Sequence, residues 1–446
     1  MKYLQKITFS SLKDLLIKTG LVLLPYSHFK WLPDLGTTRP VSSVLFVFAF
    51  GFAFISQVFK EKFHPVRTIR NFYSEQLLKL PGWQALRFWL LLIGLGTLSA
   101  LITPFYGNFF QALNRLLGYW IIFTVLFCGY YAVQAMGILK TSWLISVGYV
   151  PVLIYAVIES LAVLNIAPAI SFVLLFRRWL IVDFTWAHRL ALFTTEPSFI
   201  AFQLLLLITV MPFLSSKFLR VNSILLVGLG LIFSKSGTVI LILGSYFVFL
   251  FLFSLKRAFF YRFVLILCIL VIAFGVAYAA LPGLRSSMQQ LWVSAMKVDR
   301  LRGMYFSSLI RSSYSRNLIY VMLETRGLGL GIGQYGQFWK EIYLRHIDYH
   351  GFDILGEVTN QLNSPAYMRP WSVILGIGSD LGIFGMILLG FFFYFSFKPV
   401  SSPHGRAILL AGIMAMLGAY PIVTPHVWLA IAMMTAHELQ LKLGSQ

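Results

Sequence analysis

Cationic side chains lie beside apolar segments at several places between residues 166 and 371. A first group, in residues 166–196, consists of Arg177, Arg178, His188 and Arg189. Lys235 lies between two apolar runs. Residues 282–371 add Arg300, Arg302, Arg311, Arg316 and Arg326. An unpaired cation near the hydrocarbon region of a bilayer is costly, and arginine binds phosphate oxygens through two parallel hydrogen bonds. These residues therefore predict a site for an anion.

The sequence gives little evidence of sites for nucleotide binding, metal binding or thiol chemistry. The glycine-rich segment 327–336 lacks the Gly-Lys-Ser/Thr ending of a phosphate-binding loop. Its glycines are expected instead to let the backbone approach a ligand or a helix closely. His346 and His350 are four residues apart without the central glutamate of the His-Glu-x-x-His motif. Both cysteines, Cys128 and Cys268, lie in apolar runs, which is typical of packing. We expect no metal, no cofactor and no disulfide.

The elements that must position these cations are membrane helices. Hydrophobic residues make up 59% of the 446 residues and charged residues only 11%, with a mean hydropathy of +0.80. A soluble domain has roughly 25% charged residues. A water-soluble globule is therefore excluded, and an all-α polytopic membrane protein with one transmembrane domain, 1–446, is predicted. The apolar runs predict about twelve transmembrane helices, at 15–33, 41–58, 88–106, 117–136, 142–165, 197–214, 222–234, 236–254, 263–281, 372–395, 407–422 and 424–438.

The distribution of basic residues predicts the orientation. The net charge is +21, and cytoplasmic loops rich in Lys and Arg account for such an excess without nucleic acid as a partner. With the N-terminus inside, the short inner segments hold 18 Lys and Arg residues and the short outer segments hold 6. Both termini are therefore expected in the cytoplasm. Residues 282–371 then form one large outer loop, which should carry structure of its own.

An outward-facing anion site beside the membrane suits one kind of ligand. A lipid-linked pyrophosphate would keep its apolar tail in the bilayer while its charged head contacts the arginines. The outer compartment supplies no ATP, so a transferase working there needs a donor that arrives already activated. A polyprenyl-pyrophosphoryl sugar is such a donor.

Four segments resemble, in their order along the chain, the superfamily of Wzy-type O-antigen polymerases and O-antigen ligases. The segments are His188–Ser198 with Glu196-Pro197-Ser198, the turn Ser234-Lys235-Ser236-Gly237, Ser315-Arg316 followed after ten residues by Gly327, and Asp380-Leu-Gly-Ile-Phe-Gly385. The turn has Lys235 where the family more often has arginine, which keeps the charge and loses the bidentate fork. The matches run from about residue 185 to about residue 390.

This resemblance implies a GT-C-like fold and a metal-independent glycosyl transfer on the periplasmic side of a bacterial inner membrane. A growing glycan would leave its undecaprenyl pyrophosphate and join the acceptor sugar of a new lipid-linked repeat unit. Cations would stabilise the charge on the leaving pyrophosphate, and a base would take the proton of the attacking hydroxyl. The residues implied for catalysis are Glu196 as the base, Arg189 and Arg316. Those implied for binding pyrophosphate are Lys235, Arg311, Arg316, Gly327 and Gly331, and those for binding sugar are Tyr335 and Asn363.

Several alternatives stay open at this stage. Glu196 also suits a helix start before Pro197 without any catalytic role. An O-antigen ligase, which transfers finished glycan to lipid A–core, is an alternative function. Ser372 fits the ligase spacing, but Trp371 stands where the ligases have histidine, which favours the polymerase. A flippase for the same lipid-linked sugars should show paired halves and ionisable residues at midplane depth. A chain-length regulator and a flippase are the expected protein partners.

Overall fold

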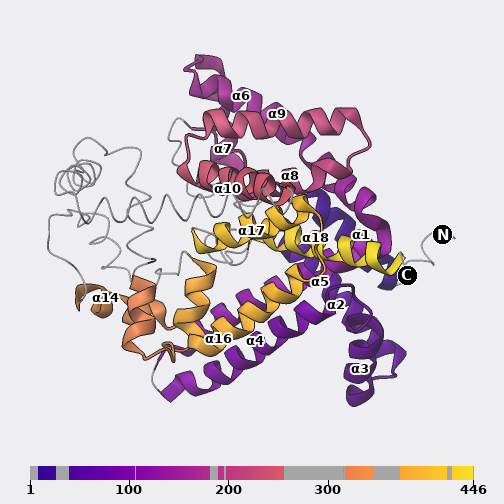
Figure 1. Ribbon diagram of the computed structural model, residues 1–446, viewed down its shortest axis with the longest axis vertical. Helices are drawn as coiled ribbons and strands as arrows, with labels where there is room; N and C mark the ends of the chain where they lie inside the picture. The colour runs from indigo at the N-terminus through magenta and orange to yellow at the C-terminus, as the bar shows by residue number, and fades with distance from the viewer. Residues whose placement is uncertain are drawn as a thin grey trace.

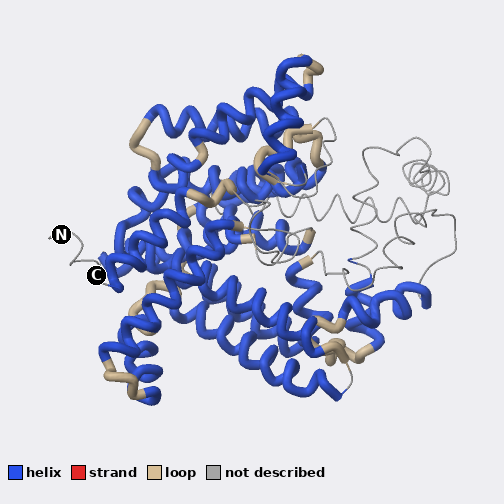
Figure 2. The backbone as a smooth tube through the Cα atoms, turned by 180° about the vertical axis from the view of Figure 1, so that it is seen from behind, coloured by secondary structure: helices blue, strands red, loops and turns tan. Residues whose placement is uncertain are grey.

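The computed structural model describes residues 9–26, 40–105, 107–180, 189–194, 197–255, 315, 317–345, 372–418 and 424–444. Within these ranges every regular element is helical, which confirms the all-α prediction (Figures 1 and 2). The α-helices are α1 Phe9–Val22, α2 Val41–Lys60, α3 Pro65–Phe72, α4 Trp83–Ile102, α5 Phe109–Gly148, α6 Val150–Val163, α7 Ala167–Leu180, α8 Ile200–Val210, α9 Lys217–Phe233, α10 Gly237–Ser254, α14 Tyr335–Arg345, α16 Val373–Phe397, α17 Pro403–Leu417 and α18 Pro425–Gly444. A π-helical segment, Tyr73–Leu77, extends α3, and short 3₁₀ turns are Thr103–Phe105, Pro197–Phe199 and Met211–Phe213.

Several of these helices are long and apolar enough to cross a bilayer, so the protein spans a membrane. The five candidate spans in the described residues are Val41–Lys60, Trp83–Phe105, Phe109–Val163, Gly237–Ser254 and Val373–Phe397. Large apolar side chains cover their outer surfaces, as in α4, where Leu91 and Leu98 are more than half exposed. A surface of this kind is stable against lipid and unstable in water. Twelve spans and a GT-C-like fold stay predictions.

The apolar stretch Phe109–Val163 contains more than one crossing. Its 55 residues would form a helix about 80 Å long, whereas the hydrocarbon core of a bilayer is about 30 Å thick. Gly137 interrupts the helical backbone inside α5 with φ 75° and ψ 161°. Only glycine adopts such angles readily, so the chain changes direction there. The sequence predicts two spans in this stretch, 117–136 and 142–165, separated close to that glycine.

Hydrogen bonds bring α1 and the last turns of α18 together with α5 at one end of the helix bundle. The Tyr131 hydroxyl of α5 donates to Asp14 of α1 at 3.0 Å, and Gln440 of α18 donates to the Val133 carbonyl at 3.1 Å. Gln134 donates to the Lys79 carbonyl at 3.0 Å, which adds the segment between α3 and α4. We call this part of the molecule the terminal end; Figures 1 and 2 both show α1, α18 and α3 at one edge.

The opposite ends of the same helices meet at a second surface, which we call the loop end. His426, near the start of α18, bonds the Leu24 carbonyl that follows α1. Ser99 of α4 accepts a hydrogen bond from Ile332 N–H at 2.9 Å. The amide of Gln334 bonds both the N–H and the carbonyl of Asn108, the residue before α5. The helices therefore alternate in direction between two surfaces, as a chain that crosses a bilayer repeatedly must do.

Aromatic packing holds α4, α5, α16 and α18 together between these ends. The Trp89 ring contacts Phe392 and Trp428 edge to face, with ring centres 5.5 and 4.8 Å apart. Its indole N–H, which would be costly to bury without a partner, donates to the Tyr119 carbonyl at 2.9 Å. Phe88 stacks on Phe391, so α4 lies along α16, as Figure 1 shows.

Two segments expected as loops contain helices. Residues 166–196 include α7, whose proline at the second helical position suits the first turn of a helix. Residues 282–371 include a helix at 317–324 and α14, which confirms that this segment carries structure of its own. The predicted span 263–281 lies outside the described residues.

Candidate functional site

Two of the cationic segments singled out in the sequence lie side by side at the loop end. The N–H of Leu190, the residue after Arg189, donates to the Phe233 carbonyl at 2.9 Å. Phe233 is the last residue of α9 and immediately precedes the turn Ser234–Gly237 that carries Lys235. Lys235 has a positive φ of 47° and an exposed side chain, and Arg189 is half-buried. The structure thus brings together the segments of two predicted site residues that are far apart in the sequence.

A fully buried ion pair supports the segment that contains Arg189. Glu159 of α6 and Arg177 of α7 lie 2.7 Å apart, with 0% and 1% of their side chains exposed. Both also bind the backbone of the segment 189–194. Glu159 accepts from Leu192 N–H at 2.8 Å, and Arg177 donates to the Leu192 carbonyl at 3.3 Å and to the Thr194 carbonyl at 2.6 Å. The pair therefore fixes this segment against two helices.

This ion pair also stabilises a strained backbone. Leu192 has φ 51°, which costs a residue other than glycine roughly 1–3 kcal/mol and persists only when its surroundings hold it. Here both its N–H and its carbonyl bond to the buried pair. The sequence-based expectation that Arg177 is one of the cations facing an anionic ligand is therefore wrong. Its guanidinium is occupied by Glu159 and backbone carbonyls, and it acts as a structural support.

The glycine-rich segment packs against α16 at another part of the loop end. Gly327, Gly329, Gly331 and Gly333 all have positive φ values, from 73° to 94°. A Cβ on Gly329 would lie 2.7 Å from the Gly382 nitrogen, so no other residue fits there. Leu330 N–H donates to the Ser379 carbonyl at 2.7 Å. Of the two expected uses for these glycines, the structure shows the close approach to a helix.

Two glycines predicted to bind pyrophosphate use their amides within the protein. Gly331 N–H donates to the Asp380 carbonyl at 3.1 Å, and Gly327 N–H donates to the Met322 carbonyl at 2.7 Å. A backbone N–H supplies one hydrogen bond, so neither amide is free for a phosphate oxygen in this structure. Tyr335 likewise occupies a packing position: it is 2% exposed, and its hydroxyl lies 3.4 Å from the Asn317 amide. A sugar contact by Tyr335 stays a prediction.

Asp380 is the centre of a buried network that joins three elements. Its carboxylate accepts from Arg115 Nε at 2.7 Å, from the Tyr119 hydroxyl at 3.1 Å and from Gly333 N–H at 3.1 Å. The Asp380 side chain is 1% exposed and that of Arg115 is 12% exposed. The network therefore ties α5, α16 and the glycine-rich segment together. Sequence reasoning did not find it, although a single carboxylate inside the apolar run 372–395 signals that a partner is required.

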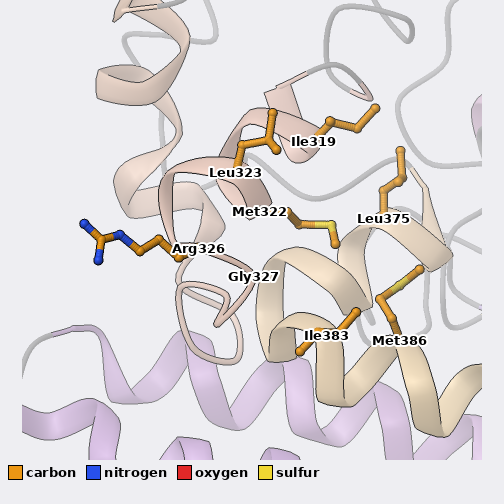
Figure 3. Close-up of a pocket in the computed structure, with 8 residues that line it drawn as sticks. All are labelled: Ile319, Met322, Leu323, Arg326, Gly327, Leu375, Ile383 and Met386. Carbon is orange, nitrogen blue, oxygen red and sulfur yellow. The ribbon is translucent and has the colours of Figure 1, made fainter.

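An apolar cavity of about 570 Å³ lies beside the start of the glycine-rich segment and α16 (Figure 3). It is lined by Ile319, Met322, Leu323, Arg326, Gly327, Leu375, Ile383 and Met386. The cavity lies between the helix 317–324 and α16, and Figure 3 shows the Arg326 guanidinium extending away from the apolar side chains. A space of this size and composition suits an apolar chain better than a polar ligand.

The predictions for Glu196, Arg311, Arg316 and Asn363 fall outside the described residues. On either side of Glu196, the Thr194 carbonyl accepts a hydrogen bond from Arg177 and Ser198 is buried in the 3₁₀ turn Pro197–Phe199. Among the residues that the structure describes, no three His, Cys, Asp or Glu side chains group as metal ligands would.

Fold and site together define a polytopic α-helical membrane protein with cationic segments held at one end of its helix bundle. No family model matches the chain, and a search of the curated proteins finds no match.

Proposed function

We propose that this protein is a polysaccharide polymerase that joins undecaprenyl-pyrophosphate-linked oligosaccharide units at the periplasmic side of a bacterial inner membrane. The observation that carries the proposal is the contact between Leu190 and Phe233. It places the segments of Arg189 and Lys235 together at the loop end. The buried pair of Glu159 and Arg177 fixes the segment that contains Arg189. Two cations on a rigid support beside a bilayer suit the pyrophosphate head of a lipid-linked sugar.

In the proposed reaction, a hydroxyl of the acceptor sugar attacks the anomeric carbon of the donor glycan. The bond from that carbon to the pyrophosphate oxygen breaks, and undecaprenyl pyrophosphate leaves with the bonding electron pair. Arg189, Lys235 and Arg316 stabilise the negative charge that builds on it. Glu196 takes the proton of the attacking hydroxyl. The apolar cavity beside the glycine-rich segment is large enough to receive part of a polyprenyl chain.

The position of the basic segments at the terminal end supports a periplasmic loop end. The terminal end contains segments that the sequence assigns to the cytoplasm, among them the first half of α1, the last turns of α18 and the α2–α4 connection. Cytoplasmic segments are rich in Lys and Arg in polytopic proteins, and the α2–α4 connection contains Lys62, Arg67, Arg70 and Lys79.

Cysteine labelling should place the loop end outside the cytoplasm. In a chain with Cys128 and Cys268 changed to alanine, Gln337→Cys should react with a membrane-impermeant maleimide in intact cells, since Gln337 is exposed at the loop end. Lys62→Cys, at the terminal end, should react only after the inner membrane is opened. The reverse pattern would place the proposed site in the cytoplasm and overturn the proposal.

Glycan analysis of a deletion strain tests the function itself. Loss of the protein should leave single repeat units attached to the lipid A–core, because units are made and transferred but never joined to each other. Undecorated core with accumulated lipid-linked polymer would instead identify the ligase alternative. Loss of all external lipid-linked units, with accumulation on the cytoplasmic side, would identify the flippase alternative.

A further inference from the structure

Residues 60–79 turn back from the end of α2 and form the second arm of a helical hairpin that projects from the bundle at the terminal end (Figures 1 and 2). We call residues 60–79 the α3 hairpin. The chain leaves α2 at Lys60 and turns through Lys62 and Phe63, which have positive φ values of 52° and 61°. His64 then caps α3, because its ring accepts a hydrogen bond from Arg67 N–H. The π-helical segment Tyr73–Leu77 continues the helix.

One face of the α3 hairpin is fixed to the end of α2. The Phe72 ring is 5% exposed and packs edge to face on Phe50 and Phe54, with ring centres 5.5 and 5.3 Å apart. Lys60 and Glu75 form an ion pair at 2.6 Å, and Asn71 donates to Glu61 at 2.7 Å. These contacts set the orientation of the hairpin relative to a helix that crosses the bilayer.

Another side of the same helix carries apolar side chains that the described residues leave largely exposed, although the Tyr73 ring packs edge to face on Trp83 and the Phe63 ring on Phe59. Val66, Ile69 and Tyr73 recur at intervals of three and four residues, so they share one side of the helix. They are 69%, 63% and 44% exposed, and Phe63, beside them in the turn, is 68% exposed. A contiguous apolar face of this kind marks a surface that contacts a membrane or another protein.

Basic side chains border this apolar face. Lys62, Arg67, Arg70 and Lys79 are exposed, and none of the four forms an ion pair with another described residue. The hairpin contains five basic and two acidic residues. Both acidic side chains are already engaged, Glu75 by Lys60 and Glu61 by Asn71. The α3 hairpin therefore presents an apolar strip and an uncompensated positive charge on the same exposed surface.

We infer that the α3 hairpin binds the surface of an anionic lipid bilayer, with its apolar strip among the acyl chains and its cations against head-group phosphates. Amphipathic helices with basic polar faces bind membranes in this way. Lipid is the occupant because the hairpin directly follows the end of a membrane-spanning helix, so it starts at the bilayer surface. Charge complementarity then selects anionic head groups. The inference rests on the membrane-spanning fold alone and is independent of the proposed polymerase activity.

Site-directed fluorescence on the full-length protein in nanodiscs tests this inference. In the Cys128→Ala, Cys268→Ala background, an environment-sensitive probe is attached to Ile69→Cys on the apolar strip or to Ser74→Cys on the polar side. With nanodiscs that contain phosphatidylglycerol, the probe at residue 69 should emit at shorter wavelength and be quenched by brominated acyl chains. The probe at residue 74 should stay in water.

Charge neutralisation supplies the matched comparison. Each basic side chain near an anionic surface favours binding by about five-fold, so Arg67→Gln with Arg70→Gln should lower the ratio of inserted to released hairpin about 25-fold. Lys140→Gln, which removes an exposed cation outside the hairpin, should leave that ratio unchanged. Pure phosphatidylcholine or high salt should mimic the double variant.

Three outcomes would overturn the inference. The probe at residue 69 could remain in water in anionic nanodiscs, which would assign the apolar strip to a protein partner. Lipid could quench both probes equally, which would show that the hairpin has no preferred face. Insertion could be equal in anionic and neutral lipid and unchanged by the arginine variants, which would exclude head-group recognition.

Discussion

Replacing Asp380 with alanine should lower the free energy of unfolding by about 3–5 kcal/mol, the typical cost of leaving one partner of a buried ion pair alone. Arg115 would keep its charge at a position where 12% of the side chain is exposed. The Tyr119 hydroxyl and Gly333 N–H would lose the same acceptor. The measurement is chemical unfolding of the full-length protein in detergent micelles.

A double substitution separates the pair interaction from simple loss of volume. Arg115→Met combined with Asp380→Leu removes both charges and keeps apolar bulk, so most of the lost stability should return. Arg345→Ala is the matched control, because Arg345 pairs with Glu324 at 2.6 Å but is 52% exposed. It should cost less than about 1 kcal/mol. Equal losses for Asp380→Ala and Arg345→Ala would show that the buried network has no special structural role.

Replacing Arg189 with alanine should slow polymerisation about 100- to 1000-fold per folded molecule, which is the typical cost of losing one donor to a developing negative charge. Arg189→Lys should recover only part of the rate, because an ammonium keeps the charge and loses the planar fork. The assay measures the turnover of purified lipid-linked repeat units, with membrane level and thermal stability followed in parallel.

The control for Arg189 is Arg345→Ala. Arg345 is an exposed arginine of α14 that pairs with Glu324, and its loss should leave turnover near that of the unaltered protein. If turnover depended only on the total surface charge of the protein, the Arg189 variant and the control variant would be slowed equally. A well-folded Arg189→Ala protein with normal turnover would remove Arg189 from the proposed mechanism.

The helices could be predicted from sequence wherever one apolar run fills the width of a bilayer. The predicted spans 41–58, 236–254 and 372–395 correspond closely to α2, α10 and α16. Such runs specify their own structure, because a backbone in lipid must satisfy its hydrogen bonds within the helix. The amphipathic helices α3 and α7 could not be predicted in this way, because they do not form long apolar runs.

The pairs that organise the site could not be predicted from periodicity. Arg115 and Asp380 are 265 residues apart, and neither position indicates the other. Arg177 shows the opposite difficulty: it belongs to a cationic segment in sequence, but burial and Glu159 give it a structural role. Sequence pattern indicates which residue types are present at the membrane boundary. Which of them pair with each other depends on long-range packing of the helices.

The separation of Arg115 from Asp380 also affects how the chain enters the membrane during synthesis. At about 5–20 residues per second, roughly 13–53 s pass between the synthesis of Arg115 and that of Asp380, 265 residues later. Glu159 and Arg177, 18 residues apart, are both made within roughly 1–4 s. Arg115 lies in the second turn of α5, so its long side chain can reach the head groups during the wait. An arginine in the middle of that helix could not reach the head groups, so its insertion would depend on a partner from helices that had not yet been made.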